Sequence, residues 1–345
     1  MAVVWIDGFD NYGTSGVPSP TNIVARRYAI TALESNMLIR DGRFGEYGIV
    51  LNNNPTCYIS PGPLTTNATL IVGFAFKFPS LPWASGREFL SFYDGTTLGI
   101  NVKTAADGQF SIYLGTSLVA TSTSAAIVAD TWYYFELKVI CNTYTGSYEL
   151  RISDTPILSA TNQNTKNGSH DYHTTFRLYG TTWVEAYGPR YDDLYACDGS
   201  GATNNDFLGN VRVSTLRPDG AGDSTQFTPS AGDNYTCVDE VTVNDNTDYV
   251  SDGTSGHTDL YTYSDTTLSG IKAIAICTDC RETDAKTMNI HNVCKSGGTQ
   301  DDGSSVIIGS CNFVQKQRIL ETDPNTSGQW QAANLNSAQF GVKIA

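Results

Sequence analysis

The feature that most constrains this chain is a repeated alternation of apolar and polar residues with a period of two. In LIVGFAFKF (70–78) every second residue is large and apolar, and in TWYYFELKVI (131–140) aromatic and aliphatic residues alternate with Glu136 and Lys138. Successive side chains of a strand point to opposite faces, so the pattern predicts strands with one buried and one solvated face, typical of antiparallel sheets. The same alternation recurs in residues 110–115, 146–153 and 175–180.

Composition favours an all-β fold. Charged residues make up only 16% of the chain, so the Lys and Glu that cover helix surfaces are scarce, whereas the 32 glycines and 19 tyrosines suit turns and sheets. Two segments, 22–34 and 327–339, retain a weak helical pattern, and Ser327 is the expected cap of the second. We therefore predict an all-β protein built from sandwiches.

The length of 345 residues predicts two domains, because single hydrophobic cores rarely grow beyond about 250–300 residues. The boundary is expected at DGSGATNN (198–205), which breaks the alternation. The first domain would then span 1–197, with its first 60 residues or so supplying outer strands, and a linker over 198–205 would lead to a second β-domain over 206–345. Strand-like segments of the second domain are 207–216, 234–243, 268–277 and 305–311.

Charge and hydropathy exclude several classes of partner. The formal net charge is −14 and no basic cluster is longer than Arg26-Arg27, so nucleic-acid binding is disfavoured. No apolar run approaches the roughly 18 residues of a membrane-spanning helix. The first residues, MAVVWIDGFD, lack the basic and apolar regions of a secretory signal. We expect a protein made in a cytoplasm, without membrane insertion.

Cysteine and histidine patterns resemble metal sites only in part. The eight cysteines are expected to be reduced. CTDC (277–280) has the spacing of half a zinc site, but no second CxxC follows, so a strand with Cys277 buried in a core is the favoured interpretation. His170 and His173 would share one side of a helix; in a loop or strand they point in different directions, and we predict surface histidines.

The acidic segment YDDLYACDGSGATNND (191–206) has three interpretations. It is a calcium-binding loop, a catalytic carboxylate site or the junction between two domains. The Asp and Glu spacing of an EF-hand loop is missing. Strand alternation predicts that Asp192 and Asp193 point to opposite faces, which favours the junction.

Residues 64–197 resemble a concanavalin-like, laminin-G-type jelly roll. The resemblance rests on ATLIVGFAFKF, ADGQFSIYLG, DTWYYFELKVI, GSYELRI and YDDLYACD in this order. It implies a jelly-roll sandwich followed by a second β-sandwich. Domains of this kind often hold calcium beside their ligand face, which makes Asp193, Asp198 and Asp206 the candidate ligands.

A second resemblance covers most of the chain. The segments WIDGFDNY, GRFGEYGI, YDDLYACDGSGATNNDFLGNVRV and ILETDPNTSGQW are similar to virion structural proteins of tailed bacteriophages, usually described as minor tail or fibre proteins. This implies a virion component assembled in the host cytoplasm, held by other virion proteins as a homo-oligomer, with adhesion to a host-surface glycan as an added role. A tail or tail appendage is the expected position, and capsid decoration is the alternative.

Many concanavalin-like domains are glycoside hydrolases, which place two carboxylates about 5–9 Å apart. The strand motifs Glu-x-Asp-x-x-Glu and Glu-x-Asp-x-Glu of one such family are missing here, and Glu136 and Glu149 fall on outward faces of separate strands. Glu185 is the best single candidate. There is also no G-x-S-x-G nucleophile motif. We therefore predict no catalytic activity and no required metal or cofactor, with a carbohydrate-binding module or glycan hydrolase as the alternative.

Overall fold

The computed structural model describes most of the chain. The described residues are 2–14, 24–30, 37–51, 57–79, 85–105, 108–124, 127–180, 188–284 and 287–345. They form two compact units, Met1–Ser214 and Thr215–Ala345. The expected linker, 198–205, therefore lies inside the first unit. No helix in the described residues is long and apolar enough to cross a membrane.

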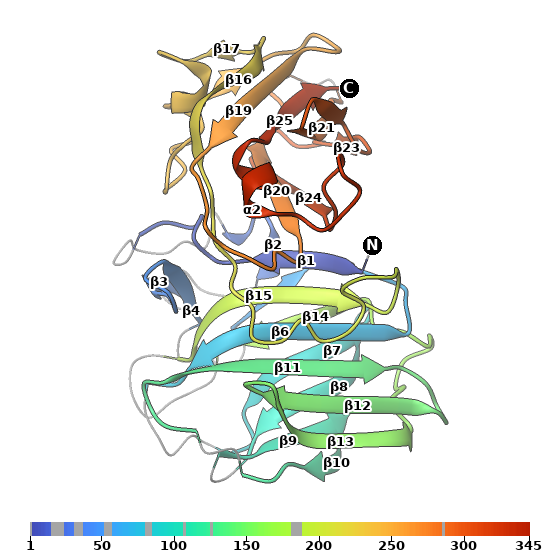
Figure 1. Cartoon of the computed structure of the whole chain (residues 1–345). Helices are drawn as coiled ribbons and strands as arrows, with labels where there is room; N and C mark the ends of the chain where they lie inside the picture. Colours follow the sequence, from blue (N-terminus) through green and yellow to red (C-terminus); the bar gives the residue numbers. More distant parts are fainter. Residues whose placement is uncertain are drawn as a thin grey trace. The chain divides into compact units, whose positions relative to one another are not determined.

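The first unit is a jelly-roll sandwich of two antiparallel sheets, seen as two layers in Figure 1. The eight-stranded sheet has, in spatial order, β13 (Thr155–Gln163), β12 (Gly146–Ile152), β11 (Trp132–Ile140), β6 (Thr69–Lys77), β15 (Arg190–Asp198), β4 (Tyr47–Leu51) and β3 (Met37–Asp41), with β1 (Val3–Asp7) paired to β15. The seven-stranded sheet has β10 (Ser117–Thr121), β9 (Phe110–Leu114), β8 (Thr97–Thr104), β7 (Glu88–Asp94), β14 (Thr175–Tyr179), β5 (Tyr58–Pro61) and β2 (Tyr28–Ile30). Strands before residue 62 thus extend both sheets.

The core of the first unit lies between these sheets, and the predicted alternation is confirmed there. Every second residue of β6 and of the central part of β11 is buried in one continuous apolar cluster. Phe89 of β7 contacts six other aromatic rings, with ring centroids 5.4–5.8 Å apart: Phe74, Phe76, Phe78, Phe110, Phe135 and Tyr191. Aromatic side chains bury the largest apolar areas, so this cluster dominates the cohesion of the two sheets.

The second unit is a smaller β-structure. Its six-stranded sheet contains β16 (Pro218–Thr225), β19 (Thr258–Tyr263), β25 (Gln339–Ile344), β21 (Asn289–Ser296) and β22 (Thr299–Asp301), with β23 (Val306–Ile307) also paired to β21. Two ribbons accompany it, β17 (Thr228–Pro229) with β18 (Val250–Ser251) and β20 (Ile274–Cys280) with β24 (Val314–Leu320). A 3-10 turn, η3 (Asn234–Cys237), and a short helix, α2 (Ala332–Asn336), complete it. Trp330 is fully buried in its main core cluster.

Several local predictions for the second half of the chain are wrong. Residues 207–216 form no strand, and 234–243 begin with a 3-10 turn. The helix predicted over 327–339 shrinks to α2, which follows Gln331 rather than Ser327. In β20 the core contains Ile276, with Ile274 and Cys280 packed against apolar clusters, whereas Cys277 is half-buried. The second unit has short strands and polar loops. The apolar–polar alternation that predicts the strands of the first unit is therefore weak there.

Candidate functional site

Two neighbouring aspartates of β15 converge, because the strand is bulged. The register of β15 with β6 shifts between Asp192 and Tyr195, and Asp193 has the left-handed φ of 51°. Asp192 Oδ2 accepts the Arg43 backbone N–H at 2.7 Å, and Asp193 Oδ2 pairs with Arg43 Nη1 at 3.1 Å. Both carboxylates therefore meet at Arg43. The prediction that they point to opposite faces is wrong, since an extra residue in a bulge breaks the alternation of a strand.

This aspartate pair is sealed from solvent. The residues are 4% and 1% exposed. Burial raises the pKa of both carboxyl groups; the neighbouring charge of Asp193 raises that of Asp192 further, while Val213 N–H and Arg43 oppose the rise at Asp193. A carboxylate pair of raised pKa is a feature of many catalytic sites. Here every approach from solvent is closed by the chain itself, so the pair is part of the architecture.

The segment that closes this site is residues 199–213, which we call the strap. It runs over the outer face of the eight-stranded sheet, where Val213 N–H donates to Asp193 Oδ1 at 2.7 Å and Gly209 N–H donates to Glu136 Oε1 at 2.9 Å. Leu208 N–H donates to the Tyr195 hydroxyl at 3.1 Å. The strap therefore satisfies its backbone donors with buried acceptors of the sheet.

Gly73 of β6 leaves space for the ring of Tyr195, whose hydroxyl group binds the strap. A Cβ atom on Gly73 of β6 would lie 2.2 Å from the ring of Tyr195. The absence of a side chain lets this ring lie flat on the sheet, and its hydroxyl donates to Glu136 Oε1. Burial raises the pKa of Glu136, against the opposing hydrogen bonds from Tyr195 and Gly209. Glu136 does face outward as predicted, but it is fully buried under the strap.

The three calcium candidates do not share a site. Asp193 is bound to Arg43 and the strap, Asp198 accepts the Thr65 hydroxyl at 2.9 Å, and Asp206 pairs with Lys138 at 2.9 Å. In the described part of the chain no three His, Cys, Asp or Glu side chains are grouped to hold a metal ion. Calcium needs six to eight oxygen ligands. These residues therefore do not fit a calcium ion.

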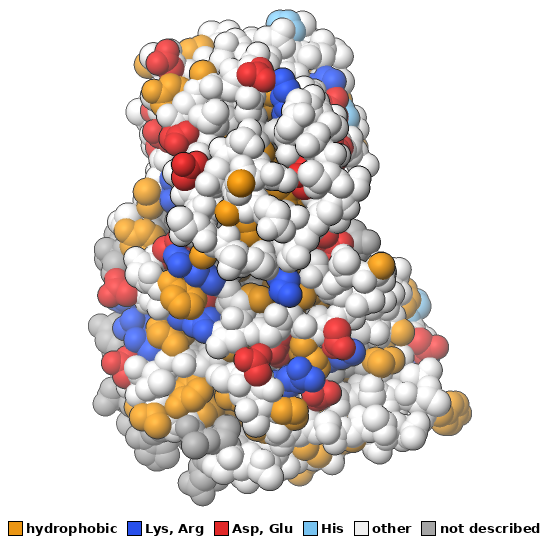
Figure 2. All heavy atoms as spheres, viewed as in Figure 1, with side chains coloured by type: hydrophobic (Ala, Val, Ile, Leu, Met, Phe, Trp, Pro, Cys, Tyr) orange, Lys and Arg blue, Asp and Glu red, His pale blue; other side chains and the backbone are white. Residues whose placement is uncertain are grey.

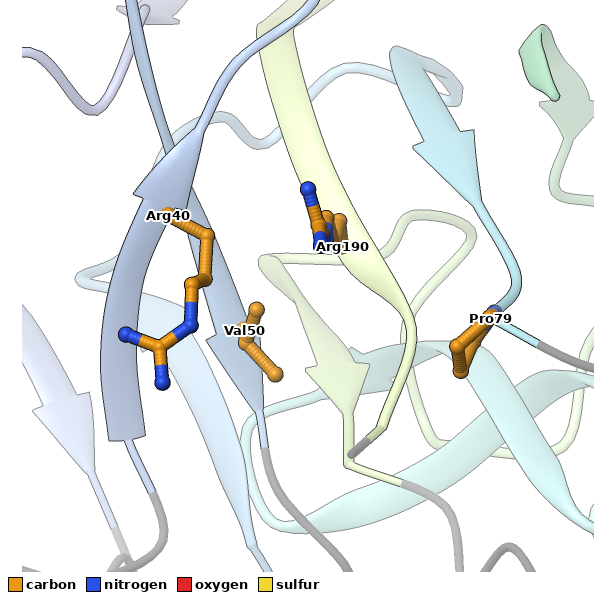
Figure 3. A pocket seen from close by; sticks show the side chains of 4 residues that line it. All are labelled: Arg40, Val50, Pro79 and Arg190. Carbon is orange, nitrogen blue, oxygen red and sulfur yellow. The ribbon is translucent and has the colours of Figure 1, made fainter. Parts of the chain in front are cut away.

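A pocket at the other end of the eight-stranded sheet brings two arginines near each other. Arg40 of β3, Val50 of β4, Pro79 and Arg190 of β15 line it. Figure 3 shows that the two guanidinium groups run in different directions instead of toward a common point. Arg40 Nη1 donates to Ile39 O at 3.0 Å, back onto its own strand. The pocket thus lacks the convergent polar groups of a ligand site.

The predicted histidine pair separates, as expected for a loop. His170 Nδ1 lies 2.8 Å from Asp94 Oδ1, and its side chain is 54% exposed. His173 is instead buried against Phe92, with ring centroids 5.7 Å apart. Burial lowers the pKa of His173 to about 4. His173 is therefore a neutral packing residue, and the prediction of a surface position is wrong for it.

The outer face of the seven-stranded sheet collects the side chains that alternate with the core residues of β5, β14, β7, β8 and β9. Pairing across these strands sets Tyr179 beside Tyr58, Arg177 beside Ser91, Asn101 beside Tyr113 and Glu88 beside Lys103. We call this surface the tyrosine face. Its members are Tyr58, Glu88, Ser91, Tyr93, Asn101, Lys103, Tyr113, Arg177 and Tyr179.

Arg177 is the centre of one half of the tyrosine face. Its guanidinium carbon lies 4.2 Å from the ring centroid of Tyr58 and 4.0 Å from that of Tyr93. Arg177 Nη1 donates to the Tyr93 hydroxyl at 3.1 Å, and the Tyr93 and Tyr179 hydroxyls lie 2.9 Å apart. Burial, strengthened by the hydrogen bond with Tyr93, raises the pKa of Tyr179. The rings of Tyr58 and Tyr93 therefore hold the guanidinium plane in place.

The other half of the tyrosine face is a polar floor with a charged rim. Ser91 Oγ donates to Asn101 Oδ1 at 2.8 Å, and Asn101 Nδ2 donates to Glu88 Oε1 at 3.2 Å. Lys103 lies 5.1 Å above the Tyr113 ring and 3.8 Å from Glu88. The side chains of Lys103 and Glu88 are 24% and 36% exposed. This half of the tyrosine face offers an aromatic ring face, an amide fixed by hydrogen bonds and two partly exposed charges. Such a combination suits a polar, ring-shaped ligand.

Sequence reasoning missed the tyrosine face. Arg177 and Tyr179 lie in the predicted strand 175–180, yet their alternation with core residues was used only to place the strand. The usable signal is a strand whose outward positions are Arg and Tyr instead of Ser, Thr or Lys. Glu185, the catalytic candidate from the sequence, lies outside the described residues.

Comparison with known proteins gives glycan-active β-structures. No family model matches the chain, and no curated protein matches it. Among solved structures, domain 4 of an extracellular arabinanase from Geobacillus stearothermophilus, in complex with arabinotriose, is 18% identical over 57% of this chain and 93% of that chain, with a TM-score of 0.40. An alginate lyase is 14% identical (55% and 95%, TM-score 0.41), and the catalytic domain of a β-glucanase from Podospora anserina is 12% identical (58% and 97%, TM-score 0.38). Likenesses at this level assign no residue and no ligand to this chain.

The prediction that the chain has no catalytic activity is contradicted by these neighbours and is withdrawn. They include glycan hydrolases and lyases. The prediction rested on a missing carboxylate motif along a single strand. A site assembled from several neighbouring strands, such as the tyrosine face, leaves no such motif in the sequence.

Proposed function

We propose that the first unit is a carbohydrate-recognition module that binds a glycan across the tyrosine face. The observation that carries this proposal is the grouping of four tyrosine rings, two cations and a fixed amide on one face of one sheet. A sugar ring offers an apolar C–H face and a rim of hydroxyl groups. The partly exposed rings of Tyr58 and Tyr113 can pack against the former, while Glu88 and Lys103 can exchange hydrogen bonds with the latter.

The dimensions of the tyrosine face suit an oligosaccharide. From β5 to β9 the sheet crosses four strand spacings, or about 19 Å. That length accommodates several linked sugar rings. The polar floor is preorganised, because Ser91 and Asn101 are each 1% exposed and bonded to one another. Preorganisation lowers the ordering cost of binding.

The test is binding of the full chain to a panel of neutral and acidic polysaccharides by affinity electrophoresis and calorimetry. The double variant Lys103→Ala/Tyr113→Ala should lose most of the binding. A matched control is Tyr144→Ala, which removes an 81% exposed tyrosine from the turn between β11 and β12 of the other sheet. Equal losses in both variants, or no binding by the unmodified chain, would contradict the proposal. Release of reducing ends, or of unsaturated products, reports in the same samples whether a bound glycan is cleaved.

We propose separately, on the sequence resemblance described above, that the chain is a component of a tailed-phage particle. A tail or tail appendage is the first choice, capsid decoration the second, and other virion proteins and further copies of this chain are the expected neighbours. Recognition of a host-surface glycan would suit an adhesion role at such a position. Cryo-electron microscopy and mass spectrometry of purified particles test it: absence of the chain from the particle refutes it, and density on the capsid lattice refutes the tail position.

A further inference from the structure

Arg177 is a half-buried cation without a carboxylate partner. Within the described residues it forms no ion pair, and its Nε is buried without a hydrogen bond. Nη1 donates to the Tyr93 hydroxyl at 3.1 Å, and the side chain as a whole is only half-buried. A guanidinium group has five N–H donors, so this one hydrogen bond leaves donors for a ligand.

Two other enclosed arginines of the first unit are each paired with an aspartate. Arg27 pairs with Asp7 at 3.1 Å, and Arg43 pairs with Asp193 at 3.1 Å. The more exposed Arg151 pairs with Glu149 at 2.7 Å. A buried charge is costly unless it is paired. Arg177 differs from these arginines, because its guanidinium group lies against the rings of Tyr58 and Tyr93 and no carboxylate of the described residues pairs with it.

We propose that the missing anion is the carboxylate of an acidic sugar, so that the tyrosine face recognises a glycan containing uronic acid. This inference rests on the proposed function and specifies its ligand class. A guanidinium group fits a carboxylate through two parallel N–H···O bonds. The rings of Tyr58 and Tyr93 fix the guanidinium plane before the ligand arrives. The sugar that carries the carboxylate would then lie beside rings and hydroxyls able to contact it.

Lys103 supplies a second cation on the same face. It lies two strands away from β14, roughly 10 Å across the sheet. Its contact with Glu88 is long, at 3.8 Å, and half open to water, so it is a weak ion pair. Two cations at this separation suit a polymer in which more than one sugar is charged. Lys103 is expected to contribute less than Arg177, since an ammonium group is a flexible point charge.

The experiment uses the full chain and matched ligands. Calorimetry compares oligogalacturonate and oligomannuronate with the same oligomers after reduction of each carboxyl group to a primary alcohol. We expect the unmodified chain to prefer at least one carboxylated oligomer by about 10- to 100-fold over its reduced form. Arg177→Gln should remove that preference, so that the carboxylated and the reduced oligomers bind the variant about equally. Arg177→Lys should give an intermediate loss, because it keeps the charge but not the planar fork.

Controls separate this inference from the proposed function. Arg151→Gln changes an arginine of the other sheet and should leave all affinities unchanged, and circular dichroism establishes that each variant is folded. Binding of neutral and acidic oligomers with equal affinity would overturn the acidic ligand while leaving glycan recognition intact. Failure of every oligomer to bind would overturn both. Polyglutamate that binds as tightly as the uronic oligomers would show a general polyanion surface and would also overturn the inference.

Discussion

The two outer faces of the first unit use charge in opposite ways. On the eight-stranded sheet, charged side chains are covered or paired by the chain itself: Asp193 with Arg43 and Lys138 with Asp206. Figure 2, viewed from this side, shows Lys and Arg interspersed with Asp, Glu and apolar groups over the unit. On the seven-stranded sheet, Arg177 is held by aromatic rings, and no carboxylate of the described residues pairs with it.

This difference separates architecture from recognition. Carboxylates of raised pKa are common in catalytic sites, yet Asp193 and Glu136 hold the strap on the sheet, and Asp192 binds the backbone of Arg43. A charge whose partner is supplied by the same chain stabilises the fold. A charge held rigidly without such a partner is instead available to a ligand. The tyrosine face, whose charged residues Arg177, Lys103 and Glu88 are partly exposed, is therefore the better functional candidate.

The largest expected effect is on the strapped face. Asp193→Asn keeps a residue type that tolerates the left-handed backbone, but it leaves Arg43 without its buried partner. We expect a loss of about 3 kcal/mol in the free energy of unfolding, measured by urea denaturation at neutral pH. Arg177→Gln, on the open face, should lose no more than about 1 kcal/mol. Similar losses in both variants would contradict the contrast between the faces.

An intermediate effect is expected at His173, beside the seven-stranded sheet. Its pKa in the folded chain, about 4, lies below the ordinary value of 6.5. At pH values between these two, His173 is protonated in the unfolded chain but neutral in the folded chain. The free energy of unfolding therefore decreases as the pH decreases. The loss from this group should be about 2 kcal/mol between pH 7 and pH 5.

His173→Gln removes this titration. Urea denaturation at both pH values should therefore show a smaller loss on acidification than in the unmodified chain. An unchanged pH dependence in the variant would mean that His173 is not buried in its neutral form. His170→Gln, which alters the exposed histidine beside Asp94 instead, is the matched control.

The smallest effect, of opposite sign, is expected at Glu136 under the strap. Burial raises the pKa of Glu136 in the folded chain. The stabilisation that comes from this group is therefore present at low pH and is lost as the pH rises through the raised pKa. Glu136→Gln retains an oxygen acceptor for Tyr195 and Gly209 while removing the titration. The variant should be more stable than the unmodified chain at pH 8 by about 1 kcal/mol or less. A loss of stability at pH 8 would indicate that the ionised form is the one the strap requires.

The sequence was sufficient for the strands of the first sandwich because those strands are long and amphipathic. Segments 70–78 and 131–140 correspond to β6 and β11, in which every second residue of the apolar pattern points to one core. In the second unit β17, β18 and β23 are two residues long, which is too short for a period to be recognised. Residues 207–213 alternate convincingly but lie on a sheet as a strap instead of joining one.

The site was less predictable than the fold. Asp193 breaks the alternation through a backbone conformation that residue type alone does not reveal. The tyrosine face depends on pairing between strands far apart in sequence, such as Arg177 beside Ser91 and Tyr58 beside Tyr179. Local patterns place a residue on one side of its own strand. They do not say which strand lies next to it, and a site spread over five strands needs that information.

Hydrogen–deuterium exchange with and without an oligogalacturonate or oligomannuronate ligand tests the central claim most directly, since it locates the ligand on one of the two faces. If a uronic oligomer binds to the tyrosine face, amide exchange should become slower in β14, β7, β8 and β9. Exchange in β11, β15 and the strap should stay unchanged. Carboxyl-reduced oligomers should protect these strands less, and Arg177→Gln should remove the difference. Protection of β15 and the strap instead, with the seven-stranded sheet unaffected, would contradict the account.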